Sequence, residues 1–394
     1  MPVSIKTDIL IIGAGIAGLW LLNRLKQLGY NAILLENNSI GSGQTIASQG
    51  IIHGGAKYSL TGKLNAATDM VADMPQFWRN CIQGIGNVDL TGVNILSEHQ
   101  YLWSTQTLAS RMAAFFGSKT LRSKIQALDR DTFPSFFQHA LFKGKVYELQ
   151  EIVIDIPSLL KKLTQQYASF ILHTPSLNLK FDDQGNVIQC EAYLNDNTPI
   201  LFEAQTYLLT AGAGNETLLK NAIKPIAMQR RPLQMAIVKH PYLQPLYAHC
   251  ISMHTKPRVT ITTHYTTQGE MIWYIGGLLA ENGVHQTSQE LIHNTHLELK
   301  TLFPWIDLSN ATITTYPIDR AEPAQKEGQL PGEVYAKIDK NIITAWPVKL
   351  ALAPKLSQLI ESILSQKNLQ PLYPINELLF TLPKASLAQP IWDR

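Results

Sequence analysis

Three glycines and one acid near the N-terminus have the types and spacing of a dinucleotide-binding motif. Gly13, Gly15 and Gly18 lie in the stretch GAGIAG, and Glu36 follows after a leucine-rich segment. In such a motif the first glycine permits a tight turn, the second lets the backbone approach a pyrophosphate, and the third lets a helix pack closely on a strand. A carboxylate at Glu36 can accept hydrogen bonds from a ribose. The pattern predicts an adenine dinucleotide site; the alternative is a glycine-rich turn in another α/β fold.

A histidine follows in a segment of small residues. His53 lies in GIIHGGAKYS, between two isoleucines and a Gly-Gly pair. An imidazole titrates near neutral pH, so it can accept a proton or pair with an anion. The small neighbours would let the loop lie flat along a cofactor ring. The alternative is a structural histidine that is hydrogen-bonded within its loop.

Two cations complete the predicted catalytic set. Arg320 in TYPIDRAEP carries a planar fork that can hold a carboxylate or phosphate by two parallel bonds, unless it forms an ion pair with Asp319 or Glu322. Lys349 could stabilise negative charge on a reduced cofactor or be a solvated lysine at a helix start. No metal site is predicted, because the four histidines of the middle of the chain lack close pairing and accompanying carboxylates; they are His240, His249, His254 and His264.

The elements that must position these residues can be outlined from the pattern. DILII predicts a strand buried on both faces, LWLLNRLKQLG a helix, and NAILLE a second buried strand that ends at Glu36. The irregular loop that follows suits an extended cofactor and favours FAD over a nicotinamide. Further on, RVTITTHYTT and EMIWYIGG predict paired antiparallel strands. The next segment predicts a helix that begins at a capping box, Thr287 and Glu290, and ends near Pro304.

Composition limits the class of protein. The 394 residues suffice for about two domains, and a net charge of +3 gives no strong signal for nucleic acid or an anionic membrane. The odd, widely spaced cysteines predict a reduced, cytoplasmic setting, and no transmembrane or export segment is expected. One basic run predicts a solvated face, with peripheral contact to membrane lipid or RNA as the alternative; it contains Arg111, Lys119, Arg122 and Lys124.

The motifs resemble the D-amino-acid-oxidase-like superfamily of flavoproteins, with its glycerol-3-phosphate dehydrogenase, L-2-hydroxyglutarate dehydrogenase and glycine oxidase branches. GIIHGGAKYS is similar to the IHGG segment of the glycerol-3-phosphate group, TYLLTAGAGNETLL to the turn that returns to the dinucleotide, and TYPIDRAEP to the segment whose arginine binds substrate anions. One departure is the glycine-rich loop that usually closes the flavin site. Here NIITAWPVKLALAPKLSQLI has no glycine, and Pro347 has no N–H to offer.

The resemblance implies an α/β fold with a Rossmann-like FAD-binding domain and an α+β substrate domain with a mostly antiparallel sheet. The expected FAD-binding domain comprises residues 1–80, 146–222 and 316–382, and the substrate domain 81–145 and 223–315, with 383–394 as a surface tail. The resemblance also implies which residues contact FAD. They are Gly13, Gly15, Ile16, Ala17, Gly18, Glu36, Asn37, Gly43, Gln44, Thr45, Ser48, Gln49, Gly50, Ile52, Ala211 and Gly212.

The function expected from these residues is FAD-dependent oxidation of a small, anionic amino acid or hydroxy acid. Hydride would pass from the substrate's α carbon to flavin N5, with His53, Arg320 and Lys349 as catalytic residues. A covalent histidyl–flavin bond at His53 is a further option, since some relatives attach flavin in this region. Two other functions stay open: modification of a tRNA base, motivated by the basic run, and flavin binding without turnover, motivated by the missing glycines.

Overall fold

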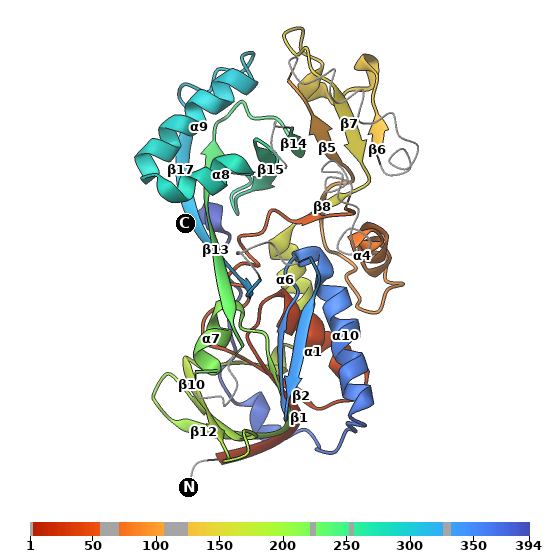
Figure 1. Cartoon of the computed structure of the whole chain (residues 1–394), viewed down its shortest axis with the longest axis vertical. Helices are drawn as coiled ribbons and strands as arrows, with labels where there is room; N and C mark the ends of the chain where they lie inside the picture. Colours follow the sequence, from red (N-terminus) through yellow and green to blue (C-terminus); the bar gives the residue numbers. More distant parts are fainter. Residues whose placement is uncertain (1–2, 56–70, 106–124, 221–225, 252–255, 326–331) are drawn as a thin grey trace.

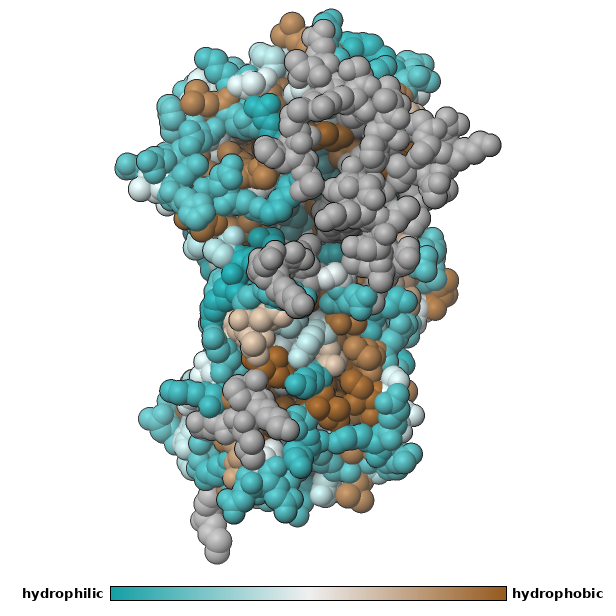
Figure 2. Space-filling model, in the orientation of Figure 1, coloured by the Kyte–Doolittle hydropathy of each residue, from teal (hydrophilic) through white to brown (hydrophobic). Residues whose placement is uncertain are grey.

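Two sheets, each of eight strands within the described part of the chain, are stacked along the long axis of the molecule (Figure 1). The lower unit in this view carries α10 (Ala353–Gln366), and the upper unit carries α9 (Ser288–Leu302). The molecule narrows between them, and on the face shown in Figure 2 apolar side chains gather on the lower unit. The computed structural model describes residues 3–55, 71–105, 125–220, 226–251, 256–325 and 332–394.

The lower sheet has a parallel centre with antiparallel additions. Its order is β10–β11–β12–β1–β2–β9; β19 pairs with the C-terminal part of β12 and also with β18. The strands β19, β12, β1, β2 and β9 run parallel, as in a sheet wound with crossover helices. The bounds are β1 (Val3–Ile12), β2 (Ala32–Glu36), β9 (Ile171–His173), β10 (Ser176–Phe181), β11 (Val187–Tyr193), β12 (Pro199–Leu209), β18 (Tyr335–Asp339) and β19 (Ile342–Trp346).

The central strand β1 is buried on both faces, which confirms the prediction from its apolar run. Ile9 and Ile11 belong to the core beneath the helices, whereas Leu10 and Ile12 belong to the core on the opposite face. This alternation follows from the two-residue period of a strand. The helices α1 (Ile16–Gln27), α6 (Ile156–Gln165) and α10 pack side by side on the first face.

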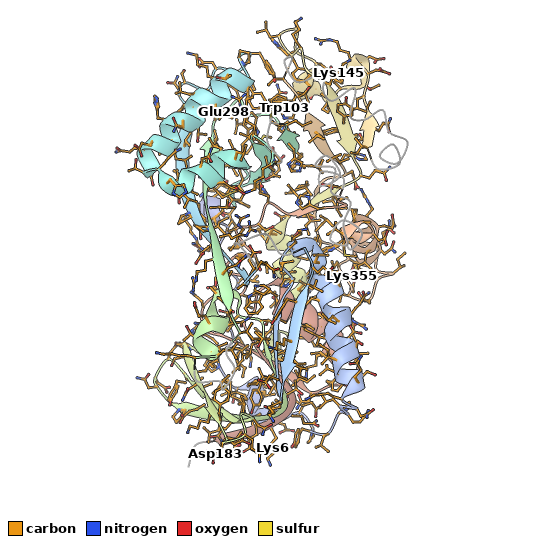
Figure 3. All side chains as sticks on the ribbon, in the orientation of Figure 1. Lys6, Trp103, Lys145, Asp183, Glu298 and Lys355 are labelled. Carbon is orange, nitrogen blue, oxygen red and sulfur yellow. The ribbon has the colours of Figure 1, made fainter. Side chains whose placement is uncertain are left out.

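The upper sheet is antiparallel apart from the parallel pair β14–β5. Its order is β17–β13–β16–β15–β14–β5–β7–β6. The helices α8 (Leu278–Asn282) and α9 cover it, and an aromatic core that includes Trp103, labelled in Figure 3, packs between the sheet and α9. The bounds are β5 (Gln100–Trp103), β6 (Ile125–Ala127), β7 (Val146–Leu149), β13 (Met228–Lys239), β14 (Ala248–Cys250), β15 (Thr260–Tyr265), β16 (Met271–Gly276) and β17 (Thr312–Pro323).

Two local predictions in this unit are confirmed. The strands β15 and β16 pair antiparallel around the Gln-Gly turn, where Gly269 has a φ of +85°. The helix α9 begins at a capping box in which Thr287 accepts from the backbone of Glu290 and the Glu290 side chain accepts from the backbone of Thr287. The helix ends at Leu302, before Pro304, as expected.

A small sheet lies between the two large ones. It consists of β3 (Ile51–Ile52), β8 (Ile152–Ile154) and β4 (Ile95–Ser97), and α4 (Met74–Ile82) packs beside it. Strand pairing bears on the expected domain limits. β7 begins at residue 146 but pairs in the upper sheet, and β17 continues in that sheet to Pro323. The division into domains stays a prediction. The pairing of β7 and β17 places its limits after Leu149 and after Pro323 instead of before residues 146 and 316.

The last residues of the chain pack against both units, so the prediction of a surface tail is wrong. Leu387 forms a β-bridge with Ile40 in the lower unit. Trp392 is 1% exposed, stacks on His264 with ring centroids 4.4 Å apart, and donates its indole N–H to the carbonyl of Tyr265. Two prolines suggested a loop, but a large apolar ring in the same segment is stabilised by burial. Among the described residues, no helix is long and apolar enough to cross a membrane.

Candidate functional site

The glycine-rich turn at the end of β1 is built as its spacing predicts. Gly13 has a φ of +105°, and a Cβ there would lie 2.5 Å from the Cα of Ala211. A Cβ at Gly18 would lie 2.0 Å from the carbonyl oxygen of Gly13, so the helix can approach the turn only with glycine here. A Cβ at Gly15 would meet a single neighbour, Thr45 Oγ1, at 3.3 Å. Gly13 and Gly18 therefore serve close packing, whereas Gly15 leaves open space at the helix start.

Two other segments converge on this turn. Thr210, at the end of β12, donates its hydroxyl to the carbonyls of Ile12 and Gly13. Thr45 accepts the N–H of Ile16 through its hydroxyl, at 3.0 Å. The side-chain nitrogen of Gln44 lies 3.6 Å from the position that a Cβ on Gly212 would occupy. The structure thus brings together the turn, the loop after β2 and the Ala211–Gly212 turn at the carboxyl ends of parallel strands, where α/β sheets bind ligands.

Glu36 closes the other side of this region. Its Oε2 accepts the N–H of Ala14 at 2.7 Å, and its Oε1 accepts the N–H of Asn38 at 2.8 Å. Burial raises the pKa of this carboxyl above its ordinary value, and the backbone N–H groups partly offset that effect. The carboxylate lies at the C-terminus of β2, next to the glycine turn, where a ribose hydroxyl could donate to it.

These features fit the adenylate and pyrophosphate of a dinucleotide. The first-turn amides of α1 have no acceptor within the helix, and Gly15 offers no capping side chain to satisfy them. The amide of Ile16 donates to Thr45, so of these two predicted contacts Ala17 supplies an amide there, next to the positive end of the helix dipole. The remaining predicted contacts lie along the loop that leads away from Glu36 toward the small central sheet. They are the exposed Asn37 and Gly43, the half-buried Ser48 and Gln49, and the buried Gly50 and Ile52.

Two of these loop residues make close contacts elsewhere in the fold, Gln49 with the upper sheet and Gly50 with β8 of the small sheet. Gln49 donates its side-chain amide to the carbonyls of Thr260 and Tyr274 in the upper sheet, at 3.1 and 3.0 Å. Gly50 has a φ of +74°, and a Cβ there would lie 2.1 Å from the carbonyl oxygen of Ile154. Tyr274, on β16 of the upper sheet, points toward this loop and donates its hydroxyl to the carbonyl of Ala47.

His53 lies one residue beyond β3, where the loop reaches the boundary between the units. Its Nδ1 is 3.2 Å from Oε2 of Glu151, and Oε1 of the same carboxylate accepts the N–H of Gly54 at 2.9 Å. The His53 side chain is 16% exposed and that of Glu151 is 2% exposed. A buried carboxylate needs such partners to remain charged. Lys57 and Tyr58, the next polar residues of the motif, lie outside the described residues.

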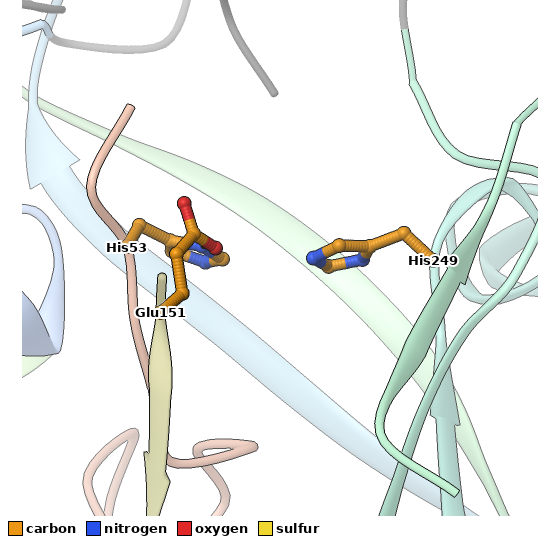
Figure 4. A group of neighbouring side chains, drawn as sticks. All are labelled: His53, Glu151 and His249. Carbon is orange, nitrogen blue, oxygen red and sulfur yellow. The ribbon is translucent and has the colours of Figure 1, made fainter. Parts of the chain in front are cut away.

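His249 approaches this pair from the upper sheet. It lies on β14, is fully buried, and its ring is 6.0 Å from that of His53 at an interplanar angle of 26° (Figure 4). Its Nδ1 is 2.8 Å from Thr260 Oγ1. The ligand atoms of the two histidines and Glu151 lie within 4.8 Å of one another. Of the histidines considered as a loose cluster, the structure brings His249 into the site, whereas His254 lies outside the described residues.

Lys349 lies near a buried acid at the other end of the site. Burial lowers the pKa of the Lys349 ammonium to about 8, and the attraction of Glu322 opposes that shift. Glu322 is 3% exposed and forms an ion pair with Arg231. Lys349 stands at a helix start, but the alternative of a solvated side chain does not hold, because the side chain is largely buried. Its neighbour Val348 adopts a φ of +55°, a left-handed conformation that is rare for a β-branched residue.

Arg320 lies on β17, with a side chain that is 27% exposed. Its Nε donates to the carbonyl of Arg231, and its Nη2 is 4.0 Å from Oε1 of Glu281. Asp319, weighed as a partner of Arg320, pairs with Arg230. The guanidinium is thus fixed through its Nε. The role of Arg320 as an anion clamp stays a prediction.

Glu151 is the residue that the sequence analysis missed. The signal for it was present in the stretch LQEIVIDIP, where a charged residue directly precedes an apolar run. Acids are almost never fully buried unless they are paired. The basic run of residues 111–124 lies outside the described residues, so the structure does not bear on it.

Comparisons with known proteins identify the family and the fold. Residues 8–316 match the family described as FAD dependent oxidoreductase. The probable FAD-dependent oxidoreductase PA4991 of Pseudomonas aeruginosa is 42% identical over 395 residues, which cover 100% of this chain and 99% of the relative. Its crystal structure superposes with a TM-score of 0.84 at 37% identity, over 100% of this chain and 99% of that one.

Two more distant structures share the fold. Iminodiacetate oxidase of Chelativorans sp. BNC1 has a TM-score of 0.66 at 15% identity, over 97% of this chain and 100% of that one. Glycine oxidase of Geobacillus kaustophilus has a TM-score of 0.66 at 14% identity, over 96% and 98%. These likenesses confirm the predicted fold class, a Rossmann-like FAD-binding domain with an α+β substrate domain.

Proposed function

The chain belongs to the family of FAD dependent oxidoreductases, and we propose that it oxidises the α carbon of a small amino acid or hydroxy acid. The observation that carries this proposal is the place of His53. The loop that leaves the dinucleotide turn ends at this imidazole, between β8 of the central sheet and β14 of the upper sheet. A proton acceptor at the end of the cofactor loop and at the boundary with the substrate unit is what such an oxidation requires.

In this proposal each residue has a separate task. The bound FAD supplies a two-electron acceptor for the hydride that leaves the α carbon. His53 accepts the proton that the substrate's hydroxyl or ammonium group loses, so that a C=O or C=N bond can form. Arg320 holds the carboxylate through its two Nη atoms, since its Nε is already bound to the Arg231 carbonyl. Lys349 stabilises negative charge at the far side of the site.

Other support comes from the names of structural neighbours. Iminodiacetate oxidase and glycine oxidase are named for small amino carboxylates, and their likeness to this chain lies in the fold. A substrate with one carboxylate beside the oxidised carbon would suit a single arginine clamp.

The proposal is tested by anaerobic addition of substrates to the FAD-loaded protein. The panel contains small amino acids, N-alkylated amino acids, 2-hydroxy acids and glycerol phosphates, and the readout is the loss of oxidised-flavin absorbance. We expect bleaching by an amino acid, with or without an N-alkyl group, or by a 2-hydroxy acid, and none by the glycerol phosphates. A flavin that every member of the panel leaves oxidised, while dithionite reduces it, would contradict the proposal and favour flavin binding without turnover.

A variant pair tests the clamp. Arg320→Met should raise KM by roughly 10- to 100-fold, because a hydrogen bond to a charged group is worth about 1.5–3 kcal/mol. Arg230→Met is the matched control: this neighbouring arginine lies on β13 and forms exposed ion pairs with Glu216 and Asp319. If both variants change KM equally, Arg320 is no specific clamp.

A further inference from the structure

The pair His53–Glu151 is a consequence of strand register. β3 and β8 run antiparallel, with Ile51 opposite Val153 and Ile52 opposite Ile152. The next position of this ladder sets residue 53 opposite residue 151, at the point where both strands stop. Side chains directly opposite each other in an antiparallel pair lie close together. The imidazole and the carboxylate therefore meet because the backbone pairing places them there.

Both oxygens of the carboxylate have a hydrogen-bond partner. Oε1 accepts from the backbone N–H of Gly54, which donates only. Oε2 faces Nδ1 of His53 at 3.2 Å. An ionised carboxylate can only accept hydrogen bonds, so the ring nitrogen that faces it must carry the proton. The lone pair of the neutral imidazole is then on Nε2.

We propose that Glu151 is a positioning residue that holds neutral His53 in the tautomer protonated on Nδ1, so that Nε2 is the atom that accepts the substrate's proton. This inference rests on the proposed function for the role of Nε2, whereas the tautomer itself is a property of the chain alone. A carboxylate that orients an imidazole in this way also stabilises the imidazolium formed when the proton arrives. Glu151 keeps that positive charge paired in a buried place.

A metal ion bound by His53, Glu151 and His249 is the competing arrangement. Zinc bonds of about 2.0–2.2 Å would require donors no more than about 4.2 Å apart. The three ligand atoms are spread over up to 4.8 Å, and Nδ1 of His249 already faces Thr260. The 3.2 Å between His53 and Glu151 is a hydrogen-bond distance, so the geometry favours the imidazole–carboxylate pair. Metal content is therefore an outcome that the experiment must include.

The variant Glu151→Gln changes the tautomer of His53 while it keeps the size of the side chain and the hydrogen bond to Gly54. The glutamine oxygen would still accept from Gly54, because the reverse orientation would set two buried donors against each other. Its amide NH₂ then faces Nδ1 and requires a lone pair there, which moves the proton to Nε2. We expect FAD binding and KM to change little, while the rate of flavin reduction by substrate falls roughly 10²- to 10⁴-fold, the usual contribution of general base catalysis. Glu151→Asp keeps the charge and should restore part of the rate.

The direct readout is the ¹⁵N spectrum of histidine-labelled protein, which distinguishes the two tautomers. We expect Nδ1–H for His53 in the unaltered protein and Nε2–H in Glu151→Gln, with the resonance assigned by its loss in His53→Gln. Glu148→Gln is the matched control, since His99 Nδ1 lies 3.4 Å from Glu148 in a more exposed pair away from the site. In this variant the rate at which substrate reduces the flavin should equal that of the unaltered protein.

Three results would overturn the proposal. They are an Nε2–H tautomer in the unaltered protein, an unchanged tautomer in Glu151→Gln, and stoichiometric zinc that is lost together with activity on chelation. If Glu151→Gln does not fold, the spectrum of the unaltered protein still decides. If no substrate reduces the flavin, the proposed function fails, but the tautomer assignment is tested all the same.

Discussion

At the scale of single residues, the glycines of the turn have different tasks, and the space around each one shows which. Gly18 abuts the Gly13 carbonyl and Thr210, both parts of the fold itself. Gly15 abuts only the hydroxyl of Thr45 and otherwise borders open space. The packing of the protein therefore demands glycine at position 18. At position 15 the demand comes from what binds there, which we propose to be the pyrophosphate of FAD.

This difference predicts opposite behaviour for two alanine variants. Gly15→Ala should lower the free energy of unfolding of the FAD-free protein by no more than about 1 kcal/mol, the usual scale of replacing a favourable N-cap residue by alanine. Its affinity for FAD should fall at least about tenfold, since the Cβ occupies the approach to the phosphates. Gly18→Ala should destabilise the FAD-free protein by about 1–3 kcal/mol through overpacking. Urea unfolding without FAD and a titration with FAD measure the two effects.

The idea that Gly15 is kept for the ligand would be wrong if Gly15→Ala bound FAD normally. The same holds if it unfolded as readily as Gly18→Ala.

The site was predictable where chemistry follows from local spacing and not where it depends on distant pairing. Gly13, Gly18 and Glu36 lie within one strand–helix–strand unit, so their arrangement could be inferred from the sequence. Glu151 could not be paired with His53 in the same way, because residues 98 positions apart meet only through the β3–β8 register. His249 belongs to the other unit and needed the whole fold.

At the scale of elements, the connection from β19 to α10 shows how this chain does without the usual glycines. Pro347 and Val348 occupy the turn, and Val348 takes the left-handed φ of +55° that a glycine would adopt without strain. Such a conformation costs a residue with a Cβ about 1–2 kcal/mol. The side chain is half-buried and packs against the core of the lower unit. The turn therefore keeps a strained backbone in exchange for packing.

The strain predicts an inverted order of stability in variants of this turn. Val348→Gly should be more stable than Val348→Ala by about 1 kcal/mol, because glycine relieves the strain and alanine does not. Val334 provides the control: it packs against the same core and has no positive φ, so there alanine should be the more stable of the two. Thermal unfolding of the four variants without FAD is the measurement. Equal orders at both positions would show that Val348 is unstrained.

Elements with a local signature were predicted well, and their assignment to a sheet was not. The capping box at Thr287 and the β15–β16 pair follow from residues close in sequence. β7 and β17 carry no mark of the sheet that they join, because the partner strands lie far away in the chain. The expected limits at residues 146 and 315 consequently cut at the start of one strand and inside the other.

At the scale of the whole molecule, the segment that ends in Trp392 ties the two units together. It bridges to Ile40 near the dinucleotide loop and then inserts its indole beside His264 and Tyr274 in the upper sheet. This burial lowers the pKa of His264 to about 3, while its Nε2 is 2.9 Å from Thr262 Oγ1. The imidazole is consequently neutral in the folded protein over most of the acidic range.

The buried histidine predicts a loss of stability in acid. Between about pH 3, the folded pKa of His264, and its ordinary value of 6.5, the unfolded chain binds one more proton than the folded chain. Stability should therefore fall as pH decreases through this window, by at most about 1.4 kcal/mol per pH unit from this group. His264→Gln can keep the contact with Thr262 and should flatten the dependence. Urea unfolding midpoints at pH 4–8 measure this pH dependence. His99→Gln, which replaces a partly exposed histidine, is the control. An unaltered slope in His264→Gln would contradict the assignment.

The place of Trp392 also affects how the protein is made. The strands β15 and β16 of the upper sheet are synthesised more than a hundred residues before the indole that fills the space beside Tyr274. Until residues 391 and 392 have emerged from the ribosome, that sheet keeps an apolar surface open to water and to other nascent chains. We therefore expect a chaperone to bind this apolar surface of the nascent chain during that interval.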